Sequence, residues 1–160
     1  MTSSPSRTAA ALAAALGVTL SDSAVAPSDD TQARAIETAV LAVDHVTGAF
    51  VAFTSSGPSS GGVLVNLYVD SADRDDLVAT ADASLRAIWT SAVVRPAFVH
   101  IAIALTEKPA NAGRLELNAI DPAEVASGLA IEGSKVVRQL IMIEAKDMEA
   151  HFGAWQEGAQ

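Results

Sequence analysis

Hydrophobic and polar residues recur along the chain with two periods, one typical of helices and one of strands, and these predict the order of its elements. Residues 31–46 carry apolar side chains at three-to-four spacing, typical of a helix, and Gly48 supplies a stop signal. Residues 49–55 and 63–70 are rich in Val, Phe, Leu and Tyr, which predicts two strands joined by a loop of Gly, Ser and Pro. Residues 77–91 then predict the clearest amphipathic helix of the chain.

The segment after this helix predicts a crossover connection. Arg95-Pro96 ends the helix, because the residue before a proline is disfavoured in the helical region. Residues 98–105 alternate between aliphatic and other side chains, which predicts a strand. A strand, a helix and a strand in this order predict a right-handed crossover between parallel neighbours.

The C-terminal third predicts shorter elements. We expect a short strand over residues 114–119, a short helix that begins at Asp121-Pro122, a strand over residues 136–144 and a closing helical turn over residues 146–152. The whole pattern is α-β-β-α-β followed by β-α-β-α. It predicts an α+β fold, a two-layer sandwich in which helices pack on one face of a mixed β-sheet.

The first 26 residues have the composition of an export signal. Arg7 precedes an apolar stretch over residues 8–20, and Ala24-Val25-Ala26 forms a small-x-small cleavage site before Pro27. This order predicts a cleavable signal peptide over residues 1–26 and a single α+β domain over residues 27–160. The rival interpretation is an alanine-rich helix that a cytoplasmic protein retains. The apolar stretch is too short to predict a membrane span.

Composition narrows the classes of function. The formal net charge is −9 at pH 7, which disfavours nucleic acids and anionic membrane surfaces as partners. The sequence contains no cysteine, which excludes disulfides, thiolate metal sites and thiol catalysis, and no lipid anchor is expected. An exported domain without disulfides is typical of a bacterium, so we expect a secreted or cell-envelope location.

Three motifs suggest chemistry, but simpler explanations are favoured. Residues 57–61 match Gly-x-Ser-x-Gly, yet they lie between two predicted strands and not before the helix that a nucleophile elbow requires. The acidic run over residues 70–76 lacks the ligand spacing and glycine of a calcium loop, and helix capping explains it. Asp147 and His151 lie four residues apart, with Glu144 close by, which predicts a surface ion pair. Asp44 and His45 are expected to diverge on a helix. We therefore expect no catalytic, cofactor or metal site.

One face of the predicted sheet is the best candidate for function. Strand alternation places His100 with Phe98, opposite the aliphatic face, and we expect it near Tyr68 and Asn66. Trp155 is expected to fold back onto the domain, the alternative being contact with a partner. The candidate interface residues are Tyr68, Phe98, His100 and Trp155.

These observations predict a non-enzymatic, envelope-associated domain. It would act by self-association, as a homodimer, or by binding a protein partner through the open sheet face. Two alternatives stay open. One is a small ligand-binding protein or enzyme with a pocket between sheet and helices, and the other is a cytosolic regulatory protein that retains residues 1–26.

The chain also resembles two groups of proteins. Val46-Thr-Gly-Ala-Phe50, the second strand, the amphipathic helix and the strand from Val99 to Leu105 resemble the α-β-β-α-β arrangement of BON domains. Arg95-Pro96 and Met148-Glu-Ala-His-Phe-Gly153 are similar to features of small exported actinobacterial-type proteins of unknown function. The pattern covers roughly residues 31–153, and the BON resemblance implies a role at envelope or phospholipid surfaces.

Overall fold

Four helices and five strands make up the part of the chain that the structure describes, residues 28–57, 60–108 and 120–157 of a computed structural model. The elements are α1 (Asp29–Val40), β1 (Val46–Gly57), β2 (Ser60–Val69), α2 (Arg74–Ser91), β3 (Pro96–Ala104), α3 (Pro122–Leu129), β4 (Lys135–Val137), β5 (Leu140–Glu144) and α4 (Ala145–Phe152). The predicted signal peptide and the predicted strand over residues 114–119 lie outside these described residues.

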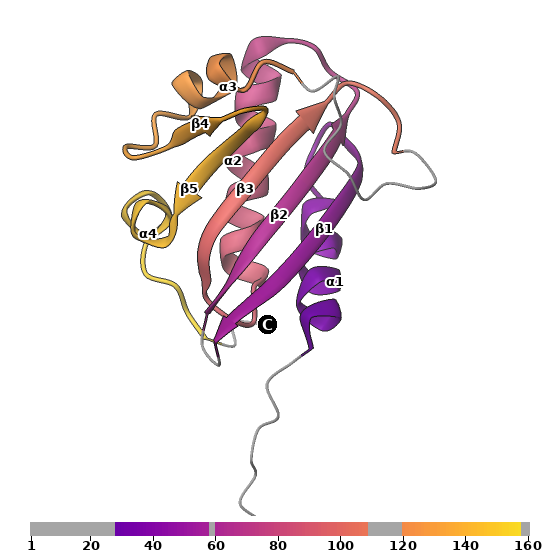
Figure 1. Cartoon of the computed structure of the whole chain (residues 1–160). Coiled ribbons are helices and arrows are strands. Elements are labelled where there is room, and N and C mark those ends of the chain that lie inside the picture. Colours follow the sequence, from indigo (N-terminus) through magenta and orange to yellow (C-terminus); the bar gives the residue numbers. More distant parts are fainter. Residues whose placement is uncertain (1–27, 58–59, 109–119, 158–160) are drawn as a thin grey trace, which may run out of the picture.

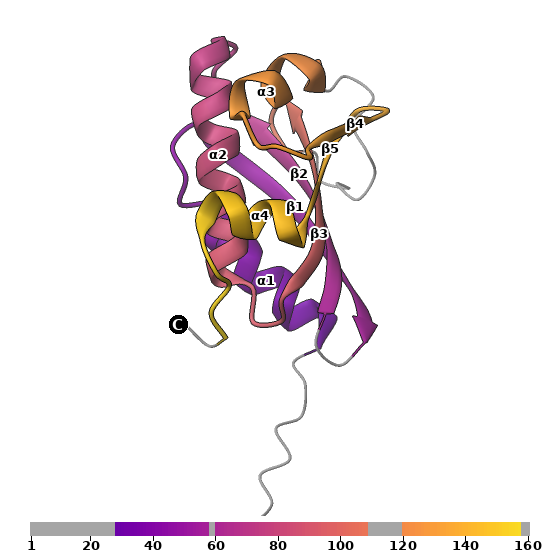
Figure 2. The same cartoon turned by 90° about the vertical axis from the view of Figure 1, so that its left-hand side faces the viewer.

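The strands form one mixed sheet in the order β1-β2-β3-β5-β4. β2 and β3 are parallel and are joined by α2, while the other neighbouring pairs are antiparallel. The helices lie on one side of the sheet and leave the other face open (Figures 1 and 2). The predicted α+β two-layer sandwich, with its parallel crossover, is therefore confirmed.

The core lies between the sheet and the helices. Alternate strand residues face the helices, and β2, β3 and β5 contribute aliphatic side chains that are almost completely buried. Trp89 of α2 belongs to this layer, and its Nε1 donates a hydrogen bond to the Gly153 carbonyl at 2.9 Å. Aliphatic alternation thus fixes which side of each strand meets the helices, and the other side forms the open face.

Polar groups hold the helices at their ends and along their sides. The Asp73 side chain accepts hydrogen bonds from the backbone N–H groups of Asp75 and Asp76, so the acidic run caps α2 as predicted. Gln32 of α1 is fully buried, and its Oε1 accepts from the backbone N–H groups of Val93 and Val94. This amide links α1 to the loop between α2 and β3.

Two predicted elements have different bounds in the structure. The helix predicted over residues 31–46 ends at Val40, because the chain turns before His45, which has a positive φ of 66°, and enters β1 at Val46. The run 136–144, predicted as one strand, is the hairpin of β4 and β5, with Arg138 at φ 59° in its turn. Among the described residues no helix is long and apolar enough to cross a membrane.

Candidate functional site

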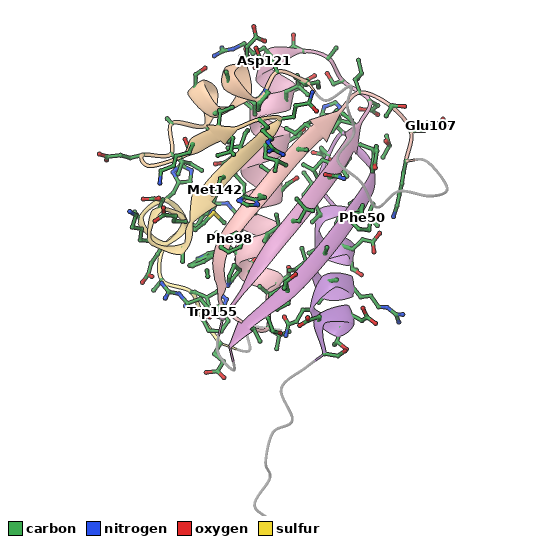
Figure 3. All side chains as sticks on the ribbon, viewed as in Figure 1. Phe50, Phe98, Glu107, Asp121, Met142 and Trp155 are labelled. Carbon is green, nitrogen blue, oxygen red and sulfur yellow. The ribbon has the colours of Figure 1, made fainter. Side chains whose placement is uncertain are left out.

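The open face carries a row of small and apolar side chains that crosses the sheet. The strand registers pair Ala52 with Leu64, Leu64 with His100, His100 with Met142, and Met142 with Lys135. All but Lys135 are half-buried. In Figure 3, Phe98 and Met142 lie on the face turned towards the viewer, the face that the helices leave uncovered. The charged residue of this row is Lys135, at its β4 end, and its Nζ lies 3.0 Å from the Glu144 carboxylate.

Phe98 is the aromatic side chain that this face exposes, at 36%. It pairs with Gly62 on β2, and a Cβ at Gly62 would overlap the Phe98 ring. The absence of a side chain at Gly62 therefore lets the ring lie against the backbone of β2. Gly61 plays the same role on the opposite face, where the ring of Phe53 covers it within the core. Adjacent glycines thus receive one aromatic ring on each side of the sheet.

His100 lies in the middle of the row as a neutral ring. Partial burial lowers the pKa of His100 below its usual 6.5, so it carries no charge at pH 7. Its ring stacks at a tilt against Phe98, with 5.0 Å between the ring centroids. The two rings give this part of the face an aromatic surface, which Glu144, the cross-strand neighbour of Phe98 in β5, borders.

Part of the open face, on β2 and β3, is covered. Tyr68 and Asn66 share the face with His100 but are almost completely buried, and so are Ala102 and Ala104, which they face in β3. The cross-strand neighbours of His100 are Leu64 and Met142, and not Tyr68 and Asn66 as expected. Of the predicted interface residues on this face, only Phe98 and His100 are accessible.

Trp155 folds back onto the domain, as expected. Its Nε1 donates a hydrogen bond to the Ala92 carbonyl at 3.3 Å, and its ring packs against the core at the end of α2. Figure 3 places it at the lower end of the sheet, below Phe98. Its half-buried ring extends the covered layer around Trp89 and is held there by the hydrogen bond.

A histidine–carboxylate cluster, which the sequence did not indicate, lies at the turn between α1 and β1. Nδ1 of His45 donates to Asp70 at 3.0 Å, and Nε2 lies 3.9 Å from Asp76. The hydrogen bond that His45 donates to Asp70 holds the pKa of His45 above its usual value. The expectation that Asp44 and His45 diverge on a helix is wrong, because this segment is a turn. The cluster borders a surface pocket of about 480 Å³ whose floor is formed by alanines and Thr80.

His151 lies near a second surface pocket, of about 450 Å³, which Glu132, Lys146 and Asp147 also line. Its Nε2 lies 2.8 Å from Asp82 of α2, so the expected ion pair with Asp147 is wrong: α4 turns this ring towards α2. Glu144 pairs instead with Lys135 and Lys146, which lower its pKa. Within the described ranges no group of three or more His, Cys, Asp or Glu could hold a metal ion.

The Gly-x-Ser-x-Gly match lies between two strands, as expected. Gly57 ends β1 and Ser60-Gly61 begins β2, while residues 58–59 lie outside the described residues. The space between the sheet and α3 is lined by Ile101, Ile103, Ile120, Pro122, Val125 and Ile141 and has no room for a water molecule. This part of the interior is a packed core and not a ligand pocket.

Sequence reasoning missed Leu64 and Met142 as the neighbours of His100, and Ala52 as the next residue of the row, because alternation assigns residues to a face without giving the strand register. A scan against protein-family models and searches of curated proteins and of solved structures find no match to this chain.

Proposed function

We propose that the chain is an exported, non-enzymatic binding domain of a bacterial envelope, and that the accessible half of the open face is its binding surface. The observation that carries this proposal is the uncharged row of Ala52, Leu64, His100 and Met142 beside the exposed Phe98. Exposed apolar patches with polar surroundings are typical of interaction sites. The accessible rows span five strands, which is roughly 20 Å across the sheet, and extend over two or three pleats along the strands. The resulting area is a few hundred Å², roughly that of a transient protein–protein contact.

The partner that this surface fits is another protein with an apolar contact patch and a net positive charge. The chain has a net charge of −9, and the row itself is neutral up to Lys135. An apolar patch would cover Phe98 and Met142, while basic residues elsewhere on the partner would favour its approach to a chain of net charge −9. A neutral His100 supports this match, because a charged imidazole would lose solvation under an apolar partner.

Export is supported by the composition of residues 1–26. Ser28 caps α1 by accepting a hydrogen bond from the Thr31 N–H at 3.2 Å. Cleavage after Ala26 would leave this cap in place. Fractionation of the native host with intact mass measurement tests export: a species that begins at Pro27 outside the cytoplasm is expected, and a full-length cytoplasmic species would contradict it.

Site-specific photo-cross-linking tests the surface. A photoreactive phenylalanine analogue at Phe98 is expected to cross-link one partner in the native host, whereas the same group at the exposed Thr90 of α2 is not. With the purified partner, Phe98→Glu and Met142→Lys should each weaken binding about tenfold or more, and Thr90→Glu should leave it unchanged. Identical products from both positions, or equal affinities for all three variants, would contradict the proposal.

A further inference from the structure

The outer edge of β1 differs from the opposite edge of the sheet. β1 is 12 residues long, and its sequence, Val46 to Gly57, contains no charged residue and no proline. The opposite edge strand, β4, has 3 residues, of which Lys135 is one, and Arg138 follows it. Proteins protect sheet edges with short strands, lysine and proline, because an unpaired edge can pair with another chain. β4 has this protection and β1 lacks it.

The backbone groups of alternate β1 residues point away from the sheet. Ser55 donates its N–H to the Asp29 carboxylate, on the side away from β2, at 3.4 Å. Gly61, which faces Ser55 in β2, donates its N–H away from β1, to the Arg95 carbonyl. Directions alternate along an antiparallel ladder, so the N–H and C=O groups of Ala49, Val51 and Phe53 also point outwards. Within the described residues no backbone hydrogen bond reaches these outward groups.

Both ends of this edge are closed by side chains. At one end the Asp29 carboxylate accepts hydrogen bonds from the N–H and hydroxyl of Ser55. At the other end the Lys108 side chain lies against Gly48: a Cβ added to Gly48 would be 2.7 Å from the Cβ of Lys108. The Nζ of Lys108 lies 2.7 Å from the Glu37 carboxylate of α1. The open edge is therefore the window Ala49–Thr54, which has the length of an average strand.

We propose that this window pairs antiparallel with the same window of a second copy of the chain, so that the two sheets become continuous. Antiparallel pairing of identical strands is self-complementary about a two-fold axis, and the two closed ends leave the same window in both copies. The window carries no charge, so two acidic molecules can approach there without like charges in contact. α1 packs beside β1, and its exposed Leu41 (45%) offers apolar surface to the helix layer of the second copy.

Hydrogen exchange of the full chain tests the pairing without any substitution. If the second copy binds here, the amides of Ala49, Val51 and Phe53 should become protected as protein concentration rises. The amides of Phe50 and Ala52, which point towards β2, should be protected at every concentration. Sedimentation velocity over the same concentrations should show conversion of monomer to dimer. A chain that stays monomeric, or dimerises without protection of the three outward amides, would overturn the proposal.

Lysine substitutions distinguish this edge from the open face. Ala52→Lys places a charge near the centre of the window, opposite or diagonal to its counterpart in the second copy, and should weaken dimerisation about tenfold or more. Met142→Lys changes the open face away from this edge and should leave dimerisation unchanged, although the proposed partner binding requires Met142. If Met142→Lys also weakens dimerisation, self-association uses the open face, to which Ala52 belongs as well, and the edge proposal fails.

Discussion

At the scale of single residues, the His45 cluster links two turns through charge interactions. The ring lies between Asp70 and Asp76, and the backbone N–H of Asp70 donates to the His45 carbonyl at 3.2 Å. The link therefore joins the α1–β1 turn to the β2–α2 turn through both side chain and backbone. Histidine tolerates the positive φ of 66° better than most residues, and asparagine does so as well.

We predict that His45→Asn makes the free energy of unfolding less dependent on pH. The hydrogen bond that the His45 ring donates to Asp70 raises the pKa of His45 above its unfolded value of 6.5. The extra stability of the wild type is thus fully present below that value and is lost as pH rises through the raised pKa. Urea unfolding of both proteins between about pH 5 and about pH 8 measures the difference. In an Asp70→Asn background most of this pH dependence should disappear, and a constant difference across the pH range would contradict the prediction.

The adjacent glycines Gly61 and Gly62 give a matched pair of substitutions. A Cβ at Gly61 would overlap the Phe53 ring, which is buried, and would lie 2.9 Å from the Thr54 carbonyl. A Cβ at Gly62 would meet only the Phe98 ring, which is exposed and can move. We expect Gly61→Ala to lower the free energy of unfolding by about 1–3 kcal/mol and Gly62→Ala to lower it less. Equal losses in urea unfolding would show that the two rings are equally constrained.

At the scale of elements, strong hydrophobic periodicity was sufficient to predict a helix or a strand where the sequence also marks the turns at its ends. The helix predicted over residues 77–91 and the strand over residues 98–105 are confirmed as α2 and β3, because Asp73 and Arg95-Pro96 mark their limits. The hairpin of β4 and β5 was not predictable, since Arg138 turns the chain without the glycine or asparagine that usually marks such a turn. Alternation also placed Phe98 and His100 on the open face. It could not show that Tyr68 is buried, because that depends on what packs over the strand.

Gln32 gives the element-scale prediction, because it joins α1 to the loop before β3. Gln32→Leu would remove the acceptor for the Val93 and Val94 N–H groups while filling a similar volume. We expect the free energy of unfolding to fall by about 1–3 kcal/mol, the cost of unpaired buried donors. Urea unfolding measures the change, and Thr38→Ala, at an exposed position of the same helix, serves as the control. An unchanged midpoint for Gln32→Leu would show that water replaces the lost acceptor.

At the scale of the whole molecule, charge and shape divide the surface into different regions. The net charge of −9 disfavours close approach of two copies over most of the surface. The neutral row on the open face and the uncharged edge of β1 are regions where this barrier is low. They lie on adjacent sides of the same strand, since Ala52 belongs to both. A dimer joined through β1 would place two open faces side by side on one continuous sheet.

The predicted cleavage site between residues 26 and 27 leads to a prediction about the stability of the whole fold. The described elements begin with the Ser28 cap of α1, and Asp29 joins α1 to Ser55 of β1. A chain of residues 27–160 is therefore expected to unfold at the same urea concentration as the full chain. A chain that begins at residue 30 loses both the cap and the Asp29 link, and its free energy of unfolding should fall by about 0.5–2 kcal/mol. If residues 27–160 alone were already less stable by this amount, residues 1–26 would be part of the folded domain, and their interpretation as a cleaved signal would be wrong.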